Sequence, residues 1–276
     1  MEKLLSHYGF WLAVVSALVL AAERLRPWRR EQRLLRPLLL QDVLWFAFNG
    51  YLLGALLSPY FSWVGAWIDR GYGALAGAAP DTVRLLSGRP LWVQVPVLLV
   101  VADLFEWLVH NLLHRVGPLW RLHRVHHSIH FMDWIGNFRF HWLEVVVYQT
   151  VKHLPLALLG ADGRAVLIVA VAATLVGHVN HANLDISWGP LRYLLNSPRM
   201  HIWHHEARLR GSAGVNFGVV LSLWDWLFRT AYMPRARVPD RIGFEGDDRL
   251  PTWMWWRFLL PFLDREGGRP SPRRAP

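Results

Sequence analysis

Three long apolar segments constrain the fold of this chain more than any other feature. They cover residues 4–22, 38 to about 60 and 91–109, and 53% of all residues are of apolar types. An α-helix needs about 20 apolar residues to cross the hydrocarbon core of a bilayer, which is about 30 Å thick. The chain also has 17 tryptophans, and tryptophan favours the bilayer interface. These features predict an integral membrane protein.

Two shorter apolar segments follow at residues 145–159 and 165–177. Each is short for a full span, so they are predicted to form a tilted or re-entrant hairpin. Residues 61–88 mix tryptophans, charges and many glycines, which predicts an interfacial or external loop. The predicted fold class is all-α: a polytopic membrane helical bundle of about four to five membrane segments, with a cytoplasmic, histidine-rich helical cap.

The formal net charge is +10, and the arginines predict the topology. Cytoplasmic flanks of membrane helices are rich in positive charge. A cleaved signal peptide would carry its charge before the apolar stretch, so the first segment is expected to remain as a span. Residues 23–37 are then cytoplasmic, and counting spans places every histidine cluster on the cytoplasmic side. No nucleic-acid-binding motif accompanies the charge, so no nucleic-acid partner is expected. The arginines that follow the first segment are Arg24, Arg26, Arg29, Arg30, Arg33 and Arg36.

Histidines recur in three clusters, one of the form His-x-x-x-His and two of the form His-x-x-His-His. Spacings of three and four residues put side chains on one face of a helix. Pro118 breaks the helix between the first two clusters, and Pro198 can open a new helix before the third. The clustered histidines are His110, His114, His123, His126, His127, His201, His204 and His205.

Converging imidazoles at these spacings predict a transition-metal site. The chain has no cysteine, so its ligands must be nitrogen or oxygen atoms. His178 and His181, three residues apart, raise the predicted ligands to ten, which suits two metal ions about 3.5–4 Å apart. Neutral imidazole binds Fe, Zn, Cu and Ni. The spacing alone leaves the role of His178 open.

Three polar residues near the clusters could either support a metal site or have an ordinary structural role. Asp103 and Glu106 precede the first cluster, and His141 follows the second. Such groups orient metal-binding imidazoles by accepting their second N–H. They are equally consistent with ordinary interfacial charges or a buried structural histidine.

These clusters resemble the histidine boxes of the fatty acid hydroxylase / sterol desaturase superfamily, which are integral membrane non-haem di-iron oxygenases. Residues 119–128 are similar to the family's Trp-Arg-x-His-x-x-His-His run, and His181-Ala-Asn183 is similar to its intermediate histidine. Asn216-Phe-Gly looks like part of its C-terminal signature, which adds Asn216 to the residues that support the site. The resemblance covers about residues 95–235, and His178 does not belong to the family's histidine motifs.

The resemblance implies two iron ions as cofactor, with zinc possible in the isolated protein, and O₂ as cosubstrate. It implies hydroxylation or desaturation of an unactivated C–H bond in a lipid of the fatty acyl, sterol or ether-lipid class. It also implies a separate electron donor of the ferredoxin or cytochrome b type, with its reductase. No catalytic side chain beyond the metal ligands is predicted.

Two other functions are alternatives to an oxygenase. A two-metal site can activate water, which would make the chain a membrane lipid hydrolase, and oxygen dependence separates the two enzymes. A membrane metal transporter or sensor would need polar residues along its spans, and the spans before Asp103 offer few.

The chain is predicted to divide into three parts. Residues 1–90 would form membrane anchor helices and an external loop, and residues 91–235 a fatty acid hydroxylase-like catalytic domain. Residues 236–276 would form an interfacial segment and a disordered tail, because residues 264–276 are rich in glycine, proline and arginine.

Overall fold

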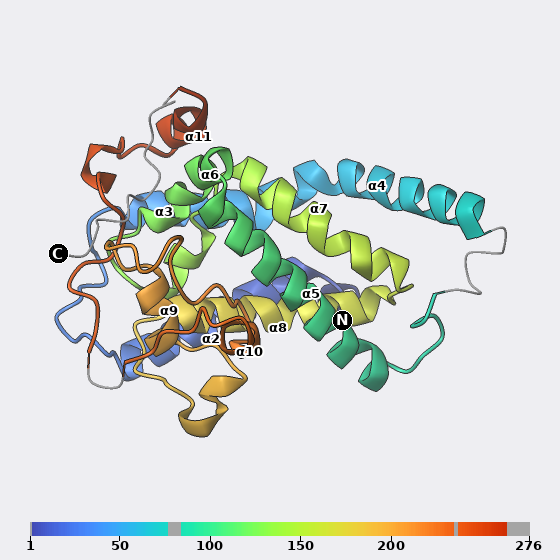
Figure 1. Cartoon of the computed structure of the whole chain (residues 1–276), viewed down its shortest axis with the longest axis horizontal. Coiled ribbons are helices and arrows are strands. Elements are labelled where there is room, and N and C mark those ends of the chain that lie inside the picture. Colours follow the sequence, from blue (N-terminus) through green and yellow to red (C-terminus); the bar gives the residue numbers. More distant parts are fainter. Residues whose placement is uncertain (1, 77–83, 235–236, 264–276) are drawn as a thin grey trace.

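The structure is a computed structural model that describes residues 2–76, 84–234 and 237–263. Every regular element within these residues is a helix (Figure 1), beginning with the short α1 (Glu2–Leu5). The strand-like pairings in this part of the chain are isolated bridges, such as Leu195 with Leu221. The all-α prediction is confirmed.

Four helical segments are long and apolar enough to cross a bilayer, which agrees with the predicted number of membrane segments. One of them is continuous through three elements, because a π-helical turn, η1, joins α3 to α4. The segments are α2 (Tyr8–Leu25); α3 (Leu39–Ala47) with η1 (Phe48–Leu52) and α4 (Leu53–Ala76); α5 (Leu91–Arg115); and α8 (Gly163–His181).

The predicted loop over residues 61–88 is wrong in its first part, because α4 continues as a helix to Ala76. A Cβ added at Gly65 or Gly71 would meet no atom within 4 Å, so these glycines do not mark tight packing or a turn. Glycine costs a helix only about 1 kcal/mol relative to alanine, and the apolar residues around it keep the helix intact. Residues 77–83 of the predicted loop lie outside the described residues.

The predicted pair of short segments is also partly wrong. α7 (Trp142–Leu158) is short, but α8 is a full-length helix that continues to His181. The Asp162 carboxylate accepts a hydrogen bond from the Arg164 N–H at 2.7 Å and caps the start of α8. Polar residues at the end of α8 hid its length in the sequence, because they face the interior of the bundle.

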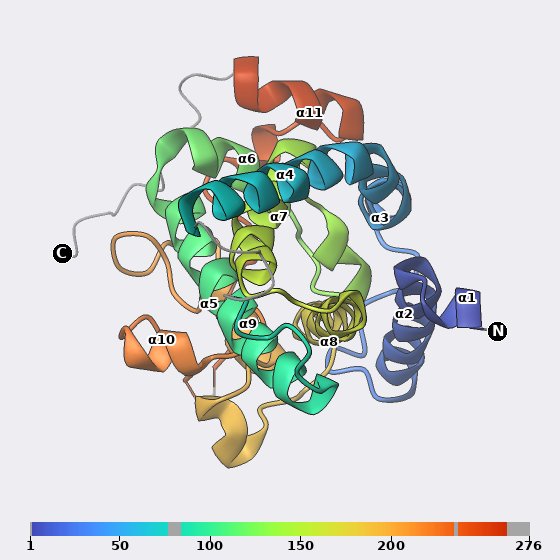
Figure 2. The ribbon, with the colours of Figure 1, turned by 90° about the vertical axis from the view of Figure 1, so that its right-hand side faces the viewer.

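The membrane helices pack side by side as one bundle (Figure 2). α2 packs along α8, where Val15 and Val19 join a buried cluster with Leu184. α5, α7 and α8 meet at a second cluster that includes Leu98 and Val169. The N-terminal helices therefore pack directly against the helices that carry the histidines, and the predicted three-part division remains a prediction.

Short helices gather at one end of the long ones, toward the left of Figure 1. They form the histidine-rich cap. The last of them lies in the predicted C-terminal segment, whose tail, 264–276, is outside the described residues. The elements are α6 (Gly117–His127), η3 (Trp134–Phe138), η4 (Gly189–Tyr193), α9 (Pro198–His204), α10 (Leu223–Leu227), η5 (Asp247–Arg249) and α11 (Met254–Leu263).

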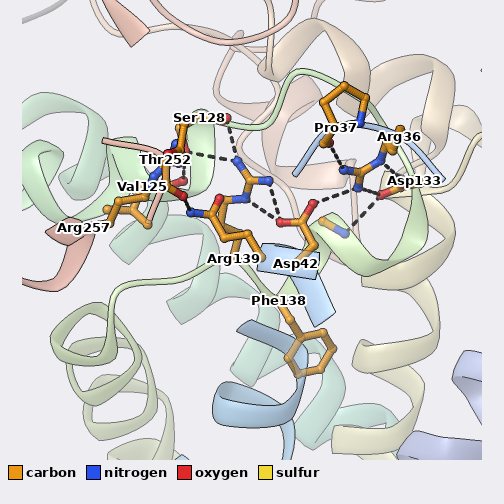
Figure 3. A network of polar contacts seen from close by, with 12 residues as sticks. Arg36, Pro37, Asp42, Val125, Ser128, Asp133, Phe138, Arg139, Thr252 and Arg257 are labelled. Carbon is orange, nitrogen blue, oxygen red and sulfur yellow. Dashed lines mark hydrogen bonds and ion pairs between the residues drawn. The ribbon is translucent and has the colours of Figure 1, made fainter. Parts of the chain in front are cut away.

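A buried ionic network ties the cap to the start of α3 (Figure 3). The Asp42 carboxylate accepts from Arg36 Nη2 at 2.8 Å and from Arg139 Nε at 2.7 Å. Arg36 also donates to both oxygens of Asp133, and Arg139 donates to the Ser128 carbonyl at 2.7 Å. Since buried charges are tolerated only when paired, the network fixes the chain on both sides of η3.

Candidate metal centre

The first two histidine clusters lie on consecutive helices. α5 carries His110 and His114 in its last turns, and α6 begins two residues after α5 ends, with Pro118 in its first turn. Proline suits a first turn because its missing N–H would have no partner there. Val116 is extended between the helices, so the chain reverses and brings His123 Nε2 to 3.1 Å from His110 Nε2.

The third cluster lies on α9. The Ser197 hydroxyl accepts a hydrogen bond from the Met200 N–H at 3.3 Å and caps this short helix, while Pro198 occupies its first position. The helix points His201 Nε2 to within 3.2 Å of His181 Nε2, and His181 is the last residue of α8.

The structure brings nine of the ten predicted ligands together in two adjoining groups. All nine side chains are buried, and within each group the possible ligand atoms lie within 4.8 Å of one another. Group A consists of His110, His114, His123, His127 and His204, and group B of His126, His181, His201 and His205.

The spacing of the ring nitrogens fits bound metal ions. In group B, His201 Nε2 lies 3.2 Å from both His181 Nε2 and His205 Nε2, and His181 Nε2 lies 3.2 Å from His126 Nε2. A ring nitrogen carries at most one hydrogen, so hydrogen bonds alone cannot satisfy this set. Nitrogens that share one ion at the usual distance of about 2.0–2.1 Å lie about 3–3.4 Å apart, which matches the observed spacing.

In four of the grouped rings, the contact made by Nδ1 fixes the tautomer. In each, Nδ1 lies beside an oxygen acceptor, so it carries the hydrogen and leaves the lone pair on Nε2, inside the group. His204 Nε2 is buried without a hydrogen-bond partner among the described residues, as expected of a ligand atom. The contacts are His110 to Phe217 O (2.7 Å), His123 to Glu144 Oε1 (2.6 Å), His181 to Gly177 O (2.9 Å) and His204 to Val215 O (2.9 Å).

Burial also keeps the rings of α6, of α9 and of the residue after α9 in their neutral form. It lowers the pKa of each of these histidines well below the ordinary range, and the neighbouring imidazoles lower the pKa further. Neutral imidazole is the form that binds metals. The histidines concerned are His123, His126, His127, His201, His204 and His205.

His178, the tenth predicted ligand, belongs to neither group. Its Nε2 lies 3.0 Å from Ser16 Oγ and its Nδ1 lies 3.1 Å from Asn137 Nδ2. Both ring nitrogens therefore have partners outside the histidine groups. His178 is thus a polar link between α2, α8 and η3, and its predicted ligand role stays a prediction that these contacts do not support.

Asp103 helps to hold a backbone segment against the site. Its carboxylate accepts from the N–H groups of Val220 and Leu221 at 2.7 and 3.0 Å. Asp225, which sequence reasoning missed, accepts from the N–H groups of Phe217 and Gly218 at 2.9 and 2.7 Å. The segment 217–221 is thus fixed by two buried carboxylates, and its first carbonyl orients His110. Asp103 acts on the imidazoles through this segment.

Asn216 joins α9 to the segment that follows the last histidine cluster. Its Nδ2 donates to the carbonyls of Met200 and Tyr232, each at 2.7 Å, and its backbone is left-handed with φ of 59°. Asparagine tolerates this conformation better than most residues. The predicted supporting role of Asn216 is thus to position the backbone around α9.

The side chains of Glu106 and His141 have their polar partners outside both groups. Glu106 pairs with Lys152 at 2.7 Å. His141 Nδ1 accepts from the Leu143 N–H, and its Nε2 lies 3.0 Å from the Phe258 carbonyl, so this ring caps α7 and links it to α11. Among the described residues, Glu144 is the carboxylate that contacts a grouped ring, and the sequence alone did not single it out for that role.

A cavity of about 450 Å³ adjoins the histidines and extends between the membrane helices. Its lining comes from α2, the η1–α4 region, α5, α7 and α8, and it reaches both groups at His110, His123, His126 and His201. Leu57, Leu99 and Val169 contribute to a largely apolar wall. This size is within the usual range of ligand cavities, about 300–1,000 Å³.

Comparison with known proteins gives concordant matches. The profile of the fatty acid hydroxylase family matches residues 95–230. The ornithine lipid hydroxylase OlsE of Rhizobium tropici is 32% identical over 157 residues, which are 57% of this chain and 47% of that protein. Alkylglycerol monooxygenase of Caenorhabditis elegans is 25% identical over 161 residues, 56% of this chain and 30% of that protein.

A third relative is the very-long-chain aldehyde decarbonylase GL1-5 of Oryza sativa subsp. indica. It is 25% identical over 189 residues, 64% of this chain and 27% of that protein. The matches thus span less than half the length of these curated relatives. No solved structure matches the chain.

Proposed function

The chain belongs to the fatty acid hydroxylase superfamily, and from this premise we propose that it is a membrane oxygenase that hydroxylates a carbon of a lipid. The proposal rests on the position of the histidine groups beside the cavity. Two groups of buried imidazoles, four of them with a lone pair directed into their group, form one end of a largely apolar cavity between membrane helices. Such a cavity admits an alkyl chain from the bilayer.

Groups A and B would each hold one iron ion. Bound iron supplies the redox chemistry, in which R–H, O₂, two electrons and two protons give R–OH and water. The protein's own residues do the rest. The imidazoles bind and stay neutral, Glu144 and the carbonyls orient them, and the apolar wall excludes water and aligns the alkyl chain.

The relatives suggest a lipid that bears a polar group, since one is named for ornithine lipids and another for alkylglycerols. We propose a substrate of the fatty acyl or ether-lipid class, with desaturation as the alternative outcome of the same C–H chemistry. The electrons would come from a separate ferredoxin or cytochrome b type donor. The arginine-rich cap would face the cytoplasm, where such a donor can reach it.

The test is lipid analysis of cells that express the chain, grown under ¹⁸O₂. We expect a lipid that gains one ¹⁸O atom, and purified protein with about two iron ions per chain. His126→Ala should lose both product and iron. His7→Ala is the matched control, because His7 is exposed and far from either group in the sequence.

Two results would contradict the proposal. One is a full-activity His126→Ala protein that contains no iron. The other is a reaction that continues without oxygen and takes its new oxygen atom from water, which would identify the two-metal hydrolase.

A further inference from the structure

An ion pair between α5 and α7 lines the cavity that adjoins the histidines. Lys152 Nζ of α7 lies 2.7 Å from Glu106 Oε1 of α5, and both side chains line the cavity. Only 18% of the Lys152 side chain and 11% of the Glu106 side chain are exposed. Charged residues at membrane depth are costly, and those found there commonly belong to functional sites.

The pair lies close to the reactive end of the cavity. Glu106 precedes His110 by four residues on α5, a rise of about 6 Å along the helix. Lys152 follows Glu144 by eight residues on α7, a rise of about 12 Å, and Glu144 bonds His123. A polar group held at the pair would leave carbon atoms only a few bonds away beside the histidines.

The pairing limits which ligands the site can accept. A ligand with one charge would draw one partner away and leave the other buried and uncompensated, which is strongly unfavourable. A purely apolar chain would gain nothing from either charge. A ligand that carries both signs compensates both residues at once. Tyr148 and Gln149 line the same stretch of wall and add polar atoms beside the pair.

We propose that Lys152 and Glu106 bind the polar group of the lipid substrate, and that this group is zwitterionic. Its carboxylate or phosphate pairs with Lys152, and its ammonium pairs with Glu106. This inference rests on the proposed function and names its substrate class: a zwitterionic lipid, oxidised at a carbon near its polar group.

The experiment measures binding to the iron-loaded protein in neutral detergent by titration calorimetry. The probes share one acyl chain: lyso-phosphatidylethanolamine is zwitterionic, lyso-phosphatidylglycerol anionic and monoacylglycerol neutral. We expect the zwitterion to bind at least about tenfold more tightly than the other two, the effect of one charged hydrogen bond. In Lys152→Met with Glu106→Leu, the three affinities should fall within about twofold of one another.

The double variant removes both charges and leaves none unpaired, so it is expected to fold. Iron content and unfolding temperature report whether it does. Lys152→Arg keeps the cation and should keep the preference. The control is Arg164→Met, which breaks the exposed Asp162–Arg164 pair outside the cavity.

A double variant that keeps the wild-type preference would show that the pair only joins α5 to α7, and would overturn the inference. A wild-type protein that binds the three probes equally would do the same. Product with ¹⁸O but no binding preference rejects this inference alone. Preference without any oxygenated product rejects the proposed hydroxylase and leaves the zwitterion site standing.

Discussion

His123 and His178 show what decides whether an imidazole in this protein keeps a ring nitrogen available for a metal. His123 uses Nδ1 for Glu144 and leaves Nε2 inside group A. His178 uses one nitrogen for Ser16 and the other for Asn137. Both are buried histidines on helices, so neither burial nor helical spacing distinguishes them. The hydrogen-bond partners of their ring nitrogens distinguish them.

Glu144→Gln tests the orienting contact. The neutral amide weakens the bond to His123 Nδ1 and no longer favours the inward lone pair, while the size of the side chain is kept. Loss of such a partner typically costs about tenfold to hundredfold in metal affinity. Iron affinity measured by competition with a chelator should fall by this amount. An unchanged affinity would show that Glu144 does not tune His123.

His178→Gln and His181→Gln form a matched pair on the same helix. We expect His181→Gln to lose the iron of group B, because His181 Nε2 contacts the ring nitrogens of His126 and His201. His178→Gln should keep the wild-type iron content, with some loss of thermal stability from its broken contacts. Elemental analysis of both purified proteins decides this, and iron loss in a folded His178→Gln protein would return His178 to the ligand set.

Sequence reasoning found the grouped histidines because their spacing repeats within short helices. It included His178 because a spacing of three residues looks the same for His178 and His181. It missed the roles of Glu144 and Asp225 because their partners are distant: Glu144 bonds a residue 21 positions away, and Trp107 donates to Asp225 from 118 positions away. No local pattern encodes such contacts.

Among the elements, the π-helical turn η1 is tied to the site through one side chain. Asn49 Nδ2 donates to the carbonyls of Phe138 and Phe140 at 2.8 and 2.9 Å. The Phe140 ring stacks on His126, with centroids 4.4 Å apart and planes 9° apart. π-Helical turns are frequent at functional sites because they redirect side chains. Here the turn supports the ring that packs on group B.

Asn49→Leu should therefore loosen the packing on His126 without removing any ligand. Two part-buried carbonyls lose their donor, which costs about 1–3 kcal/mol each where water cannot replace it. We expect a lower unfolding temperature and faster release of iron from group B than from group A. Gln32→Leu, which removes a donor to the Met132 carbonyl, is the control for loss of a similar bond. Equal release from both groups would contradict the link.

For the whole molecule, the sequence predicted the number and type of the long elements, because apolar length is what the bilayer selects. The prediction of helix bounds was wrong at residues 61–76 and in α8 for related reasons. Glycines in α4 looked like a loop, and polar residues in α8 looked like the end of a span. Both features are compatible with a helix when the glycines need no close neighbour and the polar groups face the interior.

The arginine distribution predicts the topology of the whole molecule. A reporter fused after Arg235 should read as cytoplasmic, because the cap that precedes it is rich in arginine and positive flanks stay inside. A reporter inserted after Gly88, between α4 and α5, should read as the opposite side. The reverse pair of readings would place the metal site outside the cytoplasm and overturn the proposed access of the electron donor.

The origin of group B has a consequence for biogenesis. Two of its four rings come from the short helix α9 and the residue after it, while the others come from α6 and from the end of α8. A ribosome inserts the spans in order, so the earlier rings reach the membrane long before their partners exist. If group B holds iron as proposed, its metallation would be a late event that completes maturation, and a scarce supply of iron would then yield folded but inactive chains.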